Sequence, residues 1–267
     1  MNARTFRDSI KYGIIASAVT LALPAYAEPR VGWSDLPQQL ATGQYITPTA
    51  ARGAVQQFLN PGLPDYPSFV AGTAVRSQLS PDGKTLAILC AGHNSLVKPD
   101  GTTDTANSTQ FIFLYDVSGK NKRVPKLKQV LQQTNAHVGL VFSPDGSTLY
   151  AAGGRDDVVY AYTQSEGSWS LRATIALGHN DTGIGVSVSP NASGLGISAD
   201  GKTLVVVNNY NDSISVIDTA SASVRYEHDL RPFVATNEGV VGGVGGTLPF
   251  AVVVKGNDIA YVSSDRD

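Results

Sequence analysis

The chain has 267 residues, a formal net charge of −2 and a single cysteine, and only 16% of its residues are charged. The length permits a sizeable core, and a hydrophobic content of 42% excludes a disordered chain or a coiled coil. One cysteine excludes a disulfide framework, and the charge gives no basic surface for nucleic acid. With 27 glycines and 14 prolines, the composition favours turns and short strands over long helices.

The first 27 residues have the organisation of a secretory signal peptide. Arg4, Arg7 and Lys11 form a positive region, an apolar stretch follows at Gly13–Leu23, and a small-residue cleavage pattern ends at Ala27. The apolar stretch is shorter than the ~20 residues that a membrane-spanning helix needs. We therefore predict cleavage after Ala27, a periplasmic or secreted location, and no transmembrane segment once the signal has been removed.

A turn motif repeats through the rest of the chain. Ser-Pro-Asp-Gly-Lys-Thr-Leu at residues 80–86 returns almost unchanged at 143–149 and 198–204, and in degenerate form at 254–259. The glycines of the four copies are 63, 55 and 55 residues apart. A near-constant period of this size indicates repeated supersecondary units. Asp-Gly between two β-rich runs predicts a hairpin turn, because glycine adopts the positive φ that such a turn needs.

Each repeat contains further β-rich runs after the turn, so we predict four antiparallel strands per complete unit. The predicted second strands are Thr85–Cys90, Thr148–Ala152, Thr203–Val207 and Ile259–Val262. The predicted third strands are Phe111–Tyr115, Val158–Tyr162 and Ile214–Ile217. The predicted fourth strands are Leu127–Leu131, Leu171–Leu177 and Val224–Leu230. Four-stranded units in tandem are the blades of a β-propeller.

The fold expected from this pattern is all-β, a propeller present as an incomplete arc of about three and a half blades. An N-terminal extension covers residues 28–66, and the blades cover about 67–132, 133–178, 179–232 and 233–267. The chain stops where the third strand of the fourth blade should begin. The sequence therefore predicts a fragment or truncated product of a larger propeller protein, with an open strand edge that invites pairing.

The repeat resembles the YVTN-type propellers of bacterial extracytoplasmic proteins, through residues 205–218 and 260–264. The wider sequence is similar to YncE-like propellers that precede an alkaline-phosphatase-type phosphoesterase domain. The stretches that carry this second resemblance are residues 42–51, 59–67, 176–179 and 255–266. The resemblance implies a ring that usually has seven blades, followed by a metal-dependent hydrolase domain. That domain would hold the nucleophile and the divalent metal, so the resemblance carries no catalytic or metal-binding residue onto this sequence.

One apparent nucleotide-binding motif is better explained by the repeat. Residues 196–203 match the phosphate-binding pattern G-x-x-x-x-G-K-[ST] letter for letter. A working phosphate loop needs a helix after it, whereas a β-branched run follows Thr203 here. We therefore expect a hairpin turn at this position, with no nucleotide bound.

The turns between second and third strands, and the crossings between blades, are predicted to share one face of the propeller. Concave polar faces of this kind bind ligands. The alternative is that these polar side chains satisfy turn backbones, which is the default interpretation of Asp157 and Asp212. His228, beside Glu227, is interpreted as part of a solvated strand edge. The candidate ligand-binding residues are His93, Asn94, His137, Arg155, Asp156, His179, Asn180, Asn209 and Tyr210.

Two functions of different classes remain open. The first is a binding or scaffold propeller, with a small molecule or a protein as the partner at the loop face and the chemistry in a following phosphoesterase domain. The second is a propeller lactonase or sugar-acid hydrolase with a divalent cation in its funnel. No catalytic residue, metal site or cofactor is assigned in this chain, because no carboxylate cluster converges in the sequence pattern. Nucleic acid is not an expected partner.

Overall fold

The computed structural model describes residues 38–39, 42–46, 57–179, 191–230 and 248–265. This part of the chain consists of strands and two short 3-10 helices, η1 (Gly119–Lys122) and η2 (Asn209–Asn211). It contains no helix of the length and apolar character needed to cross a membrane. The predicted signal peptide and Asn180 lie outside the described residues.

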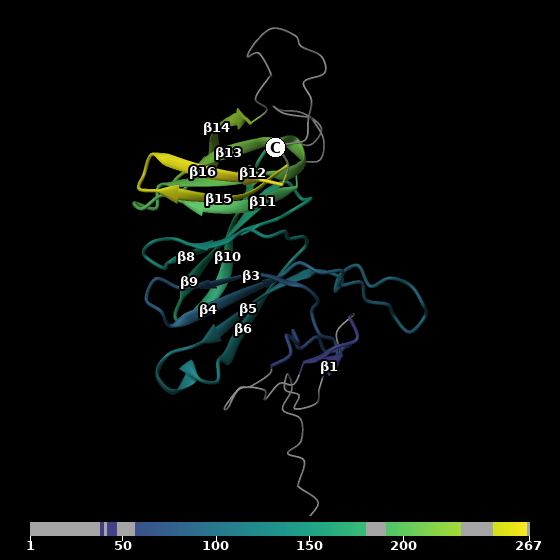
Figure 1. The fold of residues 1–267 in the computed structure, drawn as a ribbon. Helices are drawn as coiled ribbons and strands as arrows, with labels where there is room; N and C mark the ends of the chain where they lie inside the picture. The colour runs from purple at the N-terminus through teal and green to yellow at the C-terminus, as the bar shows by residue number, and fades with distance from the viewer. Residues whose placement is uncertain (1–37, 40–41, 47–56, 180–190, 231–247, 266–267) are drawn as a thin grey trace, which may run out of the picture.

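Three antiparallel sheets of four strands follow one another, each with its strands in chain order (Figure 1). The first sheet contains β3 (Ala74–Leu79), β4 (Thr85–Cys90), β5 (Gln110–Asp116) and β6 (Lys126–Gln133). The second contains β7 (Leu140–Phe142), β8 (Thr148–Ala152), β9 (Val158–Ser165) and β10 (Ser168–Ala176). The third contains β11 (Ala192–Ile197), β12 (Thr203–Asn208), β13 (Ser213–Asp218) and β14 (Ser223–Asp229).

Two smaller ladders complete the described structure. The hairpin of β15 (Pro249–Lys255) and β16 (Ile259–Ser264) packs on the third sheet through β11 and β12. A short pair, β1 (Gln38–Gln39) and β2 (Tyr45–Ile46), lies in the N-terminal region. The predicted fold class is therefore confirmed: the chain is an all-β, incomplete propeller whose complete blades are four-stranded antiparallel meanders. The segment that resembles a phosphate loop is the β11–β12 hairpin, with a strand where a helix would be required.

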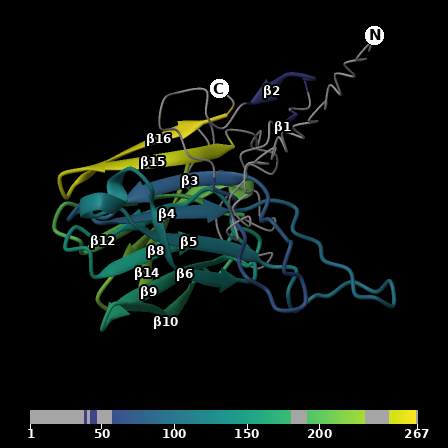
Figure 2. The same cartoon turned by 90° about the horizontal axis from the view of Figure 1, so that it is seen from below.

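The innermost strand of each blade packs against the innermost strand of the next, so β3, β7, β11 and β15 form an arc. Figures 1 and 2 label the two end strands of this arc, β3 and β15. Each contact between blades encloses its own apolar core. Leu89 and Ile112 of the first blade meet Leu140 and Leu149 of the second. Comparable clusters join the second blade to the third and the third blade to the β15–β16 hairpin. A further cluster packs the segment before β3 against the first blade.

The repeated turn is the same structure in all three complete blades. The hydroxyl of Ser80 donates to the Asp82 carboxylate at 2.6 Å and accepts the N–H of Thr85 at 2.9 Å. Ser143 and Ser198 make the same pair of bonds in their own turns. The turn glycines, such as Gly83 with φ of 69°, have the positive φ that the motif predicts. Sequence identity within the repeat thus reflects one hydrogen-bonded turn formed three times.

Two glycines allow the inner strands to approach closely. A Cβ atom added to Gly139 would fall on the carbonyl oxygen of Ser193, in the inner strand of the next blade. A Cβ atom on Gly194 would lie 2.6 Å from the carbonyl oxygen of Phe250, in β15. Both glycines stand four residues before the serine of their turn motif, so they occupy the same repeat position.

We expect Gly139→Ala to destabilise the fold by about 1–3 kcal/mol, because the added methyl group meets rigid backbone of the neighbouring blade. Gly72→Ala is the matched control, since a Cβ atom there has its nearest contact at 3.6 Å, with the amide oxygen of Asn94. Denaturant unfolding of both variants measures the difference. Equal stability of the two variants would contradict the proposed role of the glycine.

Candidate functional site

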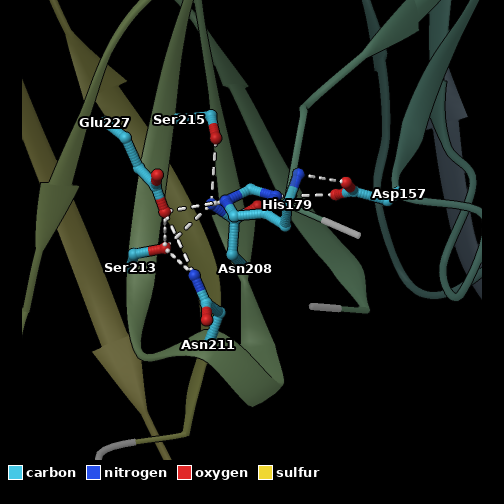
Figure 3. Close-up of polar contacts among 7 residues, drawn as sticks. All are labelled: Asp157, His179, Asn208, Asn211, Ser213, Ser215 and Glu227. Carbon is cyan, nitrogen blue, oxygen red and sulfur yellow. Dashed lines mark hydrogen bonds and ion pairs between the residues drawn. The ribbon is translucent and has the colours of Figure 1, made fainter. Parts of the chain in front are cut away.

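A connected polar cluster surrounds His179, which lies after β10 between the second and third blades (Figure 3). The His179 side chain is 1% exposed, and its two ring nitrogens contact carboxylates from different blades. Nδ1 lies 2.7 Å from Asp157, which immediately precedes β9, and Nε2 lies 2.7 Å from Glu227 in β14. The Asp157 carboxylate also accepts the backbone N–H of His179 at 2.6 Å. The imidazole therefore links two blades.

Side chains of the third blade surround the Glu227 end of this cluster. The hydroxyl of Ser213 donates to Glu227 at 2.6 Å, and the amide of Asn211 donates to the same oxygen at 3.1 Å (Figure 3). The amide nitrogen of Asn208 donates to Ser213 at 3.0 Å and to Ser215 at 2.9 Å. Asn208, Asn211, Ser213 and Ser215 are fully buried, and the side chain of Glu227 is 14% exposed.

This environment favours the protonated imidazole. Burial on its own would lower the pKa of His179, but the hydrogen bonds and charges of Asp157 and Glu227 outweigh it and raise the pKa to about 9. At neutral pH the cluster is therefore an imidazolium between two carboxylates. An imidazolium with both nitrogens engaged has no free lone pair with which to hold a metal ion or accept a proton from a substrate.

Asp157 has a counterpart at the same repeat position in the third blade. Asp157 and Asp212 both have left-handed backbone, with φ of 56° and 53°. The carboxylate of Asp212 accepts the N–H of Leu248 at 2.8 Å, as that of Asp157 accepts the N–H of His179. Each aspartate thus caps the segment that crosses to the next blade. This agrees with the turn-capping interpretation, to which the structure adds the ring contact of His179.

Three other predicted residues are bonded within the fold. The buried Asn94 accepts the N–H of Gly72 and donates to the carbonyl of Thr109. The side chain of Asn209 donates to the carbonyl of Pro249 in the adjoining hairpin at 2.8 Å. Asp156 accepts hydrogen bonds from Asn135 and from the hydroxyl of Tyr160. These side chains satisfy turns and join neighbouring segments.

The remaining predicted residues are more accessible. His93 is exposed and lies 3.2 Å from the hydroxyl of Ser95, while Arg155 and Tyr210 are exposed side chains of separate turns. His137 is half-buried, with Nδ1 2.8 Å from the hydroxyl of Ser193 and its ring edge-on to Phe250. Burial lowers the pKa of His137, opposed by the charge of Asp265, so the neutral imidazole predominates at pH 7.

The eight candidates that lie in the described part of the chain are therefore held in separate local contacts and not in one shared cluster. Glu227, Asn208, Ser213 and Ser215 belong to the His179 cluster but were absent from the sequence-based list. Strand alternation could have identified Glu227, since it faces inward from β14 while the adjacent His228 is exposed. In the described ranges, no group of three or more His, Cys, Asp and Glu residues could hold a metal ion.

Comparison with solved structures returns propellers at low sequence identity. No family model and no curated protein matches the sequence. A structure of U3-55K has a TM-score of 0.48 at 12% identity, over 71% of this chain and 45% of that one. The periplasmic gluconolactonase of Pseudomonas aeruginosa has a TM-score of 0.45 at 19% identity, and the match covers 74% of this chain and 52% of that one. A protein from Lactobacillus plantarum has a TM-score of 0.46 at 18% identity, and the match covers 75% of this chain and 52% of that one. The chain spans about half the length of these proteins.

The His179 cluster predicts a specific pH dependence of stability. Its folded-state pKa of about 9 exceeds the ordinary value of 6.5, so its stabilising contribution is complete below pH 6.5 and is lost as the pH rises through 9. We expect His179→Gln to remove about 3 kcal/mol at pH 6.5, because both carboxylates lose their cationic partner.

Urea unfolding between pH 6 and pH 10 measures this effect. The loss of unfolding free energy over that range should be smaller in His179→Gln than in the wild type. The matched control is His228→Gln, at the exposed histidine next to Glu227. The unfolding free energy of this variant should change with pH as that of the wild type does. If the unfolding free energy depends on pH in the same way in the wild type and in His179→Gln, the raised pKa of His179 is contradicted.

Proposed function

We propose that the chain is the propeller part of an exported bacterial protein and that it acts as a binding or scaffold module. In this proposal the chain is YncE-like, and the phosphoesterase chemistry of the protein, with its divalent metal, resides in a further domain. The export proposal rests on the signal-peptide pattern ending at Ala27, and the domain association rests on the resemblance of residues 42–51 and 59–67.

One observation carries the preference for a binding module over an enzyme. Several of the polar side chains predicted to line a funnel are bonded across the fold. His179 joins the second blade to the third, and Asn209 joins the third blade to the β15–β16 hairpin. Groups whose donors and acceptors are already engaged in hydrogen bonds between blades stabilise the shape of the surface. Metal-assisted lactone hydrolysis needs several oxygen or nitrogen ligands converging on one point, and no observation on the described residues favours that alternative.

Two measurements on the mature chain test this proposal. N-terminal sequencing of the exported protein should begin at Glu28, and a cytoplasmic protein that retains Met1 would contradict export. The purified chain should hydrolyse neither a simple aldonolactone nor p-nitrophenyl phosphate in the presence of Mg²⁺, Ca²⁺, Mn²⁺ or Zn²⁺.

The variant His137→Gln makes the second measurement decisive. His137 is half-buried, has a lowered pKa and lies beside the inner strands, so it is the described histidine best suited to serve an enzyme. Metal-dependent turnover that His137→Gln abolishes would overturn the binding-module proposal. Traces of turnover that persist in this variant and disappear on further purification would be due to a contaminant and would uphold it.

A further inference from the structure

One residue breaks the repeat at the centre of the arc. Gly139 and Gly194 each stand four residues before the serine of their turn motif, and Arg76 stands at the same position before Ser80. In the second and third blades this position must be glycine, because the inner strand of the next blade lies against it. The first blade instead has the longest cationic side chain there.

The strand pairing is irregular at Arg76. The pairing of β3 with β4 shifts register between Ala74 and Arg76, and the inner strands β11 and β15 shift register at corresponding places. Such bulges re-aim side chains and occur next to binding sites. The repeat thus places an arginine at a bulge of the innermost strand, where the second and third blades have glycine.

Arg76 lines two adjoining hollows. The first, of about 190 Å³, is formed where the inner strands of the arc come together, and its other walls are apolar or backbone, including Val75, Val138, Leu195, Phe250 and Val252. The second, of about 330 Å³, lies against the β15–β16 hairpin and includes Tyr261 and Ser263. Arg76, Ala251 and Val252 belong to both hollows. In each hollow Arg76 is the only charged lining residue.

The guanidinium of Arg76 has no hydrogen bond or ion pair with any described residue. Elsewhere in the described structure, Arg225 is paired with Asp218. A guanidinium presents two parallel N–H donors that match a carboxylate in a bidentate arrangement. Arg76 is exposed to solvent, and no other residue that lines either hollow carries a charge, so no neighbouring carboxylate of the lining competes with a bound anion for the guanidinium.

We propose that these hollows bind a small organic carboxylate, with its carboxylate group on Arg76 and its apolar body in the hollow lined by Phe250 and Leu195. The size is suitable, since a cavity of about 150 Å³ holds benzene. Inorganic phosphate fits less well, because a dianion would find one guanidinium and apolar walls around its remaining oxygens. This inference rests on the proposed function as a binding module and names the class of its ligand.

Calorimetric titration of the mature chain with benzoate tests the inference. We expect saturable one-to-one binding of benzoate, at least tenfold weaker binding of the neutral isostere benzamide, and at least tenfold weaker binding of inorganic phosphate. Arg76→Gln should weaken benzoate binding at least tenfold, and Arg76→Lys should retain part of it, because lysine keeps the charge and loses the bidentate geometry. Arg172→Gln, at an exposed arginine of β10 outside both hollows, should bind as the wild type does.

Several outcomes would overturn the inference. These are absence of benzoate binding to the wild type, equal binding by Arg76→Gln, equal binding of benzamide, or tighter binding of phosphate. A thermal melt of each variant shows whether it is folded, and Arg76→Lys decides the question if Arg76→Gln is not. Turnover of a lactone or phosphate ester would overturn the proposed function without altering the benzoate result, so the two proposals can fail separately.

Discussion

The packing of one twisted sheet on the next is the interaction on which the rest of this structure depends. Each apolar core lies between two consecutive blades, so no blade encloses a core by itself. Burial of these apolar faces supplies the favourable free energy of folding. The hydrogen bonds between strands satisfy the backbone N–H and C=O groups that burial removes from water. Gly139 and Gly194 set how closely the inner strands approach, because a side chain at either position would separate the two blades.

This packing explains why the polar side chains of the loop face became part of the framework. A buried polar backbone group must find a hydrogen-bond partner, and the described ends of the crossings between blades have such partners. Asp157 and Asp212 provide partners in successive blades, and His179 adds a charged link where its ring can reach Glu227. The polar residue types that a sequence pattern associates with ligand binding are the same types that form hydrogen bonds to the backbone of a folded loop.

Much of the architecture could be predicted because the same turn motif, followed by the same series of β-rich runs, occurs three times in the sequence. The strands Thr85–Cys90 and Thr148–Ala152 have the bounds that the sequence predicts, since the turn motif fixes where each second strand begins. The site was harder to predict, because it depends on contacts between positions far apart in the chain. Glu227 and His179 are 48 residues apart, and nothing local indicates that they meet. Arg76 was not among the predicted binding residues, because it stands out only when it is compared with Gly139 and Gly194 at the same repeat position.

The β15–β16 hairpin gives the central hollows one wall that differs from the others. It has two strands where each of the three blades has four, it packs on the third blade, and Val253, Ile259 and Tyr261 are exposed on it. Segments with few buried contacts open locally at a lower free energy than the whole domain. Transient opening of this hairpin would remove Phe250, Ala251 and Val252 from the first hollow, so the hollow exists only while the hairpin is packed. An occupant held by Arg76 would therefore stabilise the packed hairpin and slow amide hydrogen exchange in β15 ahead of every other strand.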